Sequence, residues 1–132
     1  MAGESILIVD DSPINLKLLR VLLAGAGYEV RAARDTEEAR AILASFSPAL
    51  IFMDLQLPGM DGYELTRRLK AAPATAGITV VAVTSYAMKG DEEKAREAGC
   101  DEYVTKPIDT QGILDLVERL LGARDKGEGG RA

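Results

Sequence analysis

The stretch Ala49-Leu50-Ile51-Phe52-Met53-Asp54 decides the fold: five apolar residues in a row end at a carboxylate. A short run that is apolar on both faces is typical of a strand inside a parallel sheet that helices cover on both sides. The run 28–33 has polar interruptions, which indicates an edge strand. The remaining strand-like runs end at polar residues and are 6–9, 78–83 and 102–105.

The segments between these runs carry helix signals. Ser12-Pro13 supplies an N-cap and a proline at the first helical position, and leucines follow at helical spacing up to Gly25. The predicted helices are about 13–25, 36–46, 61–73, 88–98 and 110–121. Five such strand–helix units predict an α/β fold with a doubly wound parallel sheet. Ligands of such a sheet bind outside the carboxyl ends of its strands.

Length and composition predict one domain over residues 1–122 and a flexible, charged, glycine-rich tail over 123–132. The net charge of -5 argues against direct binding of nucleic acid or of an anionic membrane. The first residues do not resemble a signal peptide, and no apolar run is long enough to span a bilayer. The chain has a single cysteine, Cys100, which we expect in the core, and this fits a reducing cytoplasm. We also expect the protein to be a monomer.

Polar residues stand where the predicted strands end. Because the carboxyl ends of parallel strands lie at one edge of a sheet, these side chains should line a single crevice. They are Asp10 and Asp11 after the first strand, Asp54 after the third, Thr84 after the fourth and Lys106 after the fifth.

Three carboxylates in one crevice need compensating positive charge. Two carboxylates about 4 Å apart repel by roughly 4 kcal/mol at an effective dielectric constant near 20. Lys106 supplies one positive charge, and Mg²⁺, which binds through a few carboxylates and keeps several waters, supplies two more. The main-chain carbonyl of Gln56 can add a further ligand. The predicted site is therefore a magnesium site built on Asp10, Asp11 and Asp54.

A carboxylate beside Mg²⁺ and a lysine can attack phosphorus and form an acyl phosphate. We expect Asp54 to be that nucleophile. The chain contains no histidine, so a phosphohistidine donor has to be another molecule.

Four motifs of this sequence, taken together over residues 5–121, resemble the receiver domains of two-component response regulators. Residues 81–91 are especially similar to single-domain regulators of the DivK type and to receivers fused to hybrid kinases. The motifs are Asp10-Asp11-Ser12-Pro13-Ile14-Asn15, Met53-Asp54-Leu55-Gln56-Leu57-Pro58-Gly59-Met60-Asp61-Gly62, Val83-Thr84-Ser85 and Lys106-Pro107-Ile108.

The resemblance implies the flavodoxin-like, CheY-like architecture: a five-stranded sheet in the order 2-1-3-4-5 with five helices around it. It implies that Asp54 accepts a phosphoryl group from a sensor histidine kinase or a histidine phosphotransfer protein. The face formed by the fourth helix, fifth strand and fifth helix would then bind a downstream protein that the sequence does not identify.

The resemblance also implies a role for each matching residue. Asp10, Asp11 and Asp54, with the Gln56 carbonyl, would hold Mg²⁺. Thr84 and Lys106 would contact the phosphoryl group, and Tyr103 would turn inward when Thr84 moves. The bond before Pro107 would be cis. Such a protein is a switch rather than an enzyme acting on many substrates, and Gln56 and Tyr86 would tune its dephosphorylation.

Other interpretations of the acidic set stay open. A magnesium-dependent phosphohydrolase also uses an aspartyl nucleophile, but such enzymes usually carry a second Asp where this chain has Gln56. The chain can also be a receiver cut from a hybrid histidine kinase, although the start at Met1 favours a stand-alone protein, or a receiver that serves only as a docking scaffold. An EF-hand is disfavoured, because the twelfth position counted from Asp54 is Leu65 rather than Glu.

Overall fold

Five parallel strands form one sheet in the order β2-β1-β3-β4-β5, which confirms the predicted fold. The structure, a computed structural model, describes residues 4–55, 62–84 and 90–129. The strands are β1 (Ser5–Val9), β2 (Glu29–Ala33), β3 (Leu50–Asp54), β4 (Thr79–Thr84) and β5 (Glu102–Thr105). The described helices are α1 (Pro13–Gly25), α2 (Thr36–Leu43), α3 (Gly62–Ala71), α4 (Asp91–Ala98) and α5 (Thr110–Gly129).

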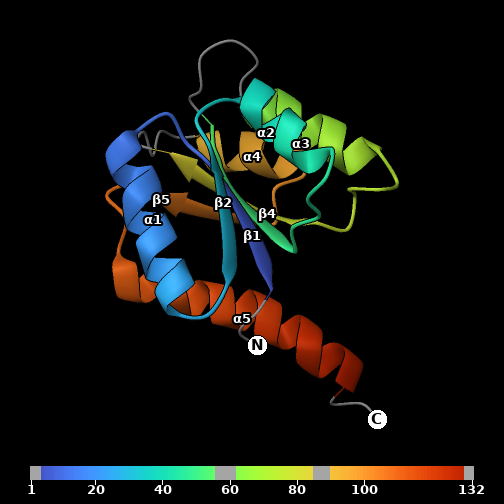
Figure 1. Ribbon diagram of the computed structural model, residues 1–132. Coiled ribbons are helices and arrows are strands. Elements are labelled where there is room, and N and C mark those ends of the chain that lie inside the picture. Colours follow the sequence, from blue (N-terminus) through green and yellow to red (C-terminus); the bar gives the residue numbers. More distant parts are fainter. Residues whose placement is uncertain (1–3, 56–61, 85–89, 130–132) are drawn as a thin grey trace.

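The helices lie in two layers, one on each face of the sheet (Figure 1). Side chains of α1 and α5 pack with Ile6 and Ile8 of β1, whereas side chains of α3 and α4 pack with Leu7 and Val9 of the same strand. Successive β1 residues therefore face opposite layers, as the two-residue period of a strand requires. This two-sided burial is the reason that the central strands are continuously apolar.

Two helix starts have side-chain caps, and the first is the cap that the sequence predicted. The Ser12 side chain accepts from the backbone N–H of Asn15 at 3.3 Å, and Pro13 occupies the first turn of α1. Asp35 accepts from the backbone N–H of Glu38 at 2.8 Å. Glu38 reaches back to the N–H of Arg34 at 2.7 Å, one residue before the cap itself.

Two helices, α2 and α5, end at residues clearly different from those predicted. α2 ends at Leu43, although Phe46 is still buried against the core from the following loop. α4 begins at Asp91, and the predicted start at Met88 lies outside the described residues. α5 continues to Gly129, so the backbone of 123–129 is helical where a tail was predicted. No described helix is both long and apolar enough to cross a membrane.

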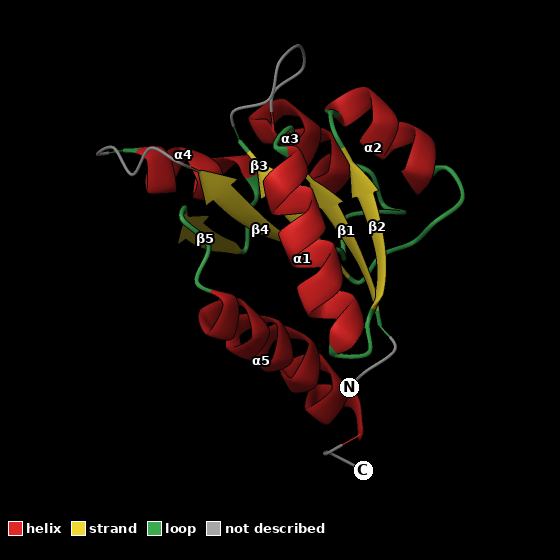
Figure 2. Cartoon of the chain, turned by 60° about the vertical axis from the view of Figure 1, so that its left-hand side comes forward, coloured by secondary structure: helices red, strands yellow, loops and turns green. Residues whose placement is uncertain are grey.

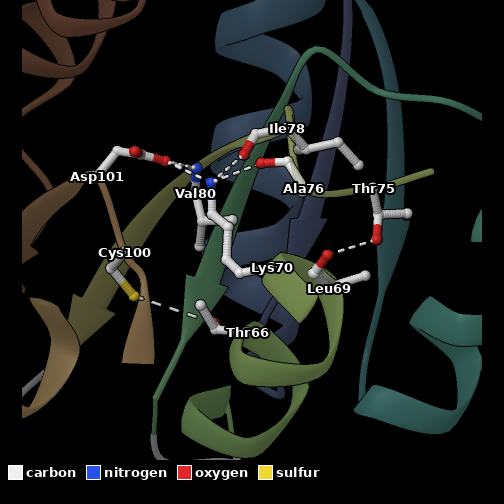
Figure 3. Close-up of polar contacts among 9 residues, drawn as sticks. All are labelled: Thr66, Leu69, Lys70, Thr75, Ala76, Ile78, Val80, Cys100 and Asp101. Atoms are coloured by element: carbon white, nitrogen blue, oxygen red, sulfur yellow. Dashed lines mark hydrogen bonds and ion pairs between the residues drawn. The ribbon is translucent and has the colours of Figure 1, made fainter. Parts of the chain in front are cut away.

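A lysine joins three elements at the amino ends of β4 and β5 (Figure 3). Lys70 of α3 donates to the carbonyl of Ile78 at 2.6 Å and pairs with Asp101 at 3.0 Å. The same carboxylate accepts from the backbone N–H of Val80 at 2.8 Å. These contacts fix the amino ends of β4 and β5, at the edge of the sheet opposite the acidic residues.

Candidate functional site

Asp54 is the last residue of β3, and its side chain is 3% exposed. Asp10 follows β1, the neighbouring strand, and its backbone N–H donates to the carbonyl of Ala33 at 3.0 Å. Asp11 comes next and is exposed. Carboxylate oxygens of Asp10, Asp11 and Asp54 all lie within 4.8 Å of one another. The parallel sheet has therefore gathered the three acids at one edge.

Lys106, the residue after β5, places its ammonium group beside these acids. Its Nζ lies 3.2 Å from Oδ2 of Asp10 and 3.3 Å from Oδ2 of Asp54, and its side chain is only 15% exposed. Burial by itself lowers the pKa of the Lys106 ammonium, but the two neighbouring carboxylates outweigh burial and raise the pKa above its ordinary value. Lys106 therefore stays charged at neutral pH and offsets part of the repulsion.

The backbone fixes where Lys106 stands. Its N–H donates to the carbonyl of Thr84 at 2.8 Å, which extends the pairing of β4 and β5 by one residue. The peptide bond between Lys106 and Pro107 is cis. Thr84 itself is fully buried at the carboxyl end of β4.

Two further residues support the acids, and the sequence indicated neither as part of the site. The N–H of Ser12 donates to Oδ1 of Asp10 at 2.8 Å, so the start of α1 orients this carboxylate. A Cβ on Gly62 would collide with the carbonyl oxygen of Asp54 and lie 3.0 Å from Cα of Leu55. The sequence showed Ser12 as a helix cap and a motif residue, and Gly62 as part of a motif, without a contact to the acids for either.

Tyr103 lies apart from the acidic group. It is half-buried on β5, pairs in register with Ala82, and packs against the core cluster under α3 and α4. Ala82 is two residues before Thr84 on the same strand, so the hydroxyl residue and the tyrosine are neighbours across two strands. Gln56 and Tyr86 lie outside the described residues.

The acids fit a hard divalent cation. Three carboxylates from two adjacent strand ends provide oxygen ligands on one side and leave other positions for water or phosphate oxygens, which is the arrangement that Mg²⁺ prefers. A thiol or imidazole ligand is absent from the described group.

Comparisons with known proteins agree with this geometry. Residues 6–118 match the family model of the response regulator receiver domain. The polar-differentiation response regulator DivK of Brucella anthropi is 41% identical over 119 residues, which cover 90% of this chain and 97% of that protein.

Solved structures give the same result. A CheY-like receiver domain protein from Methanospirillum hungatei has a TM-score of 0.87 at 29% identity, over 96% of this chain and 99% of the other. The receiver domain of sensor histidine kinase PA1611 from Pseudomonas aeruginosa has a TM-score of 0.82 at 31% identity, over 92% and 99%. That structure holds a magnesium ion coordinated in its active-site cleft.

Proposed function

The chain belongs to the response regulator receiver family, a family of two-component signalling switches, and we propose that it switches by taking a phosphoryl group on Asp54. The receiver unit is residues 1–122, and 123–132 lie outside it. The single observation that carries this proposal is the convergence of Asp10, Asp11, Asp54 and Lys106 at the carboxyl edge of the sheet.

Magnesium is the cofactor that the acids would hold. Asp10, Asp11 and Asp54 would bind it, together with the main-chain carbonyl of Gln56. When bound, the ion supplies positive charge next to the phosphoryl oxygens. The backbone N–H of Ser12 holds Oδ1 of Asp10, which leaves Oδ2 of Asp10 directed toward the acidic group.

Asp54 would act as the nucleophile. One of its carboxylate oxygens supplies the electron pair of the new P–O bond, while the donor's P–N bond breaks and its electron pair stays on the imidazole nitrogen. The Lys106 ammonium, now between Asp10 and Asp54, would pair with a phosphoryl oxygen, and the Thr84 hydroxyl would donate to another. Positioned charge, more than any covalent chemistry of the protein, would stabilise the transferring group.

The donor histidine lies outside these 132 residues, because they contain no histidine that could carry the phosphoryl group. Receiver domains work with sensor histidine kinases and histidine phosphotransfer proteins, and we propose one of these as the partner. Such kinases take the phosphoryl group from ATP, which places the exchange in the cytoplasm. The phosphorylated monomer would then bind a downstream protein.

We propose that Thr84 and Tyr103 carry the change to that binding face. When Thr84 moves toward the phosphoryl group, the space beside β4 changes, and Tyr103 on the neighbouring strand turns inward. Tyr103 already packs against the core, so a small rotation would alter what α4, β5 and α5 present to a partner.

The chemical step is tested by intact mass after incubation with Mg²⁺ and acetyl phosphate. We expect one added phosphoryl group on the wild-type chain, none on Asp54→Asn, and none when EDTA removes the metal. Glu37→Gln, which removes an exposed carboxylate from α2, should accept the group as the wild type does. No adduct on the wild type would favour a docking scaffold. Rapid turnover of many phosphomonoesters would favour a phosphohydrolase.

The switch is tested by amide NMR shifts with and without beryllofluoride, which mimics the phosphoryl group. We expect shifts from Thr84 through Lys106 in the wild type. Tyr103→Leu should keep the shifts around Asp54 and lose those in α4. If the region 84–106 of the wild type does not respond, coupling through Tyr103 is wrong.

A further inference from the structure

β5 is an edge strand of the sheet and lies between α4 and α5 (Figure 2). A groove lies along this strand. It measures about 610 Å³ and is lined by β5 and the first turns of α5. Its apolar and aromatic lining is Tyr103, Val104, Pro107, Ile113 and Leu116. An edge strand also presents backbone groups that no strand covers on its outer side.

The segment that contains this groove has the same net charge as the whole chain. Residues 90–119 contain nine Asp and Glu against four Lys and Arg, an excess of five negative charges. The full chain has a net charge of -5, so the rest of the sequence is neutral in sum. Such an excess of negative charge in one segment attracts cationic partners and repels anionic ones.

The cations of this segment already have neighbours. Arg96 pairs with Glu92 at 2.8 Å, and Arg119 pairs with Glu102 at 3.5 Å across the groove's own edge. Lys106 is held in the acidic pocket, and Lys94 lies 5.8 Å from the ring centre of Tyr63. Among the described residues, Arg96, Arg119 and Lys106 are therefore already paired with carboxylates, and Lys94 does not line the groove.

Asp109 and Asp115 are the acids that line the groove without a cation. Both are exposed. Within the described residues, no lysine or arginine lies within 4.0 Å of either carboxylate, and the one side-chain donor to Asp115 is the Gln111 amide at 3.0 Å. The groove therefore combines an apolar floor with an acidic rim that is not neutralised.

We propose that this groove receives a basic segment of a partner protein, with an apolar side chain on the floor and Lys or Arg against Asp109 and Asp115. The inference rests on the proposed function, since it names the chemistry of the partner that the switched face would bind. Nucleic acid and anionic lipid have the wrong charge for this face. Because Tyr103 lines the groove, phosphorylation would change the shape of the floor.

The test uses the full chain and a fluorescein-labelled synthetic peptide of alternating lysine and leucine, followed by anisotropy. We expect binding that weakens with added salt, and no binding of a peptide with glutamate in place of lysine. Asp115→Asn should weaken binding on the order of threefold. Glu118→Gln is the matched control: it lies on the same helix, but its charge acts on Tyr28, on the α1 side, and it does not line the groove.

Several results would overturn the inference. Equal affinity of Asp115→Asn and the wild type, or equal weakening by Glu118→Gln, would show that the acidic rim does not select the peptide. Salt-sensitive self-association in sedimentation, without peptide binding, would make a second copy of the chain the occupant. Mass spectra of each variant after acetyl phosphate separate the two proposals: normal phosphorylation without peptide binding refutes the groove alone, whereas absent phosphorylation refutes the proposed function.

Beryllofluoride adds one further comparison. We expect the treated chain to bind the lysine–leucine peptide more tightly than the untreated chain, because the inward turn of Tyr103 would deepen the floor. If beryllofluoride leaves peptide binding unchanged, the groove is still a site for a basic segment. Control of that site by phosphorylation is then refuted.

Discussion

Cys100 lies two residues before β5 and is 7% exposed, with its Sγ 4.0 Å from Oγ1 of Thr66 (Figure 3). Burial raises the pKa of the thiol above its ordinary value of 9.0, and Asp101 adds to this rise, while Thr66 and Lys70 act against it. The thiolate is the reactive form of cysteine, so this side chain is a packing residue and a poor nucleophile.

The raised pKa predicts how Cys100 affects stability at high pH. Above pH 9 the thiol ionises in the unfolded chain while it stays protonated in the folded one, so the unfolded state is favoured as pH rises. The free energy of unfolding of the wild type should fall more steeply there than that of Cys100→Ala, by up to about 1.4 kcal/mol per pH unit. Urea titrations at several pH values measure both slopes, and parallel curves would contradict the prediction.

The site shows how far a sequence can place single residues. Asp10, Asp11, Asp54 and Lys106 were predictable because each stands at or just after the carboxyl end of a strand, and a parallel sheet brings such positions together. Ser12 was not, because a helix cap and an amide donor to a carboxylate look identical in sequence. The distinction depends on a distance between backbone and side chain that only the folded chain defines.

At the scale of elements, α3 begins against the strand that carries Asp54. Gly62, its first residue, leaves no room for a Cβ beside the Asp54 carbonyl, and the obstructing atoms are backbone atoms that cannot rotate away. The close approach of α3 to the end of β3 therefore requires glycine at this position.

Gly62→Ala should destabilise the domain by about 1–3 kcal/mol, because the backbone of Asp54 and Leu55 must shift. It should also slow acceptance of a phosphoryl group from acetyl phosphate, since the displaced carbonyl belongs to Asp54. The matched control is Gly25→Ala at the end of α1, where nothing lies within 4 Å of the added carbon. That variant should gain about 0.5–1 kcal/mol. Equal thermal midpoints for the two variants would contradict the packing argument.

Element type was easier to predict than element length. Strands are recognisable because burial on both faces demands apolar residues at every position, as in β3. Helix ends depend on smaller free energies. A glycine such as Gly122 costs a helix only about 1 kcal/mol, so α5 can pass through it. Phe46 lies beyond α2 but is buried nevertheless, because a loop can deliver an apolar side chain to the core.

At the scale of the whole molecule, the segment 90–119 and α1 differ in charge. The segment 90–119 is acidic, whereas α1 carries Lys17 and Arg20 and no acidic residue. Among the described residues, the two most exposed large apolar side chains, Ile14 at 78% and Val21 at 65%, are also on α1. A groove of about 620 Å³ lies between this helix and β2. One protein can therefore present different chemistry to a phosphoryl donor and to a downstream target.

We expect the phosphoryl donor to dock on α1, because this helix starts at the rim of the acidic pocket, where the Ser12 N–H contacts Asp10, and Ile14 is exposed in its first turn. A donor histidine that reaches Asp54 has to bring a protein surface over this rim. Ile14→Ala should slow phosphotransfer from a histidine phosphotransfer protein by roughly 5–30-fold, the loss typical of an exposed apolar anchor in an interface. Transfer from acetyl phosphate needs no such surface and should keep its rate. Ile14→Leu should restore the protein-dependent rate, because it keeps the apolar contact. If Ile14→Ala slows both donors equally, the residue acts on the pocket itself; if it slows neither, the donor approaches from another side of the crevice.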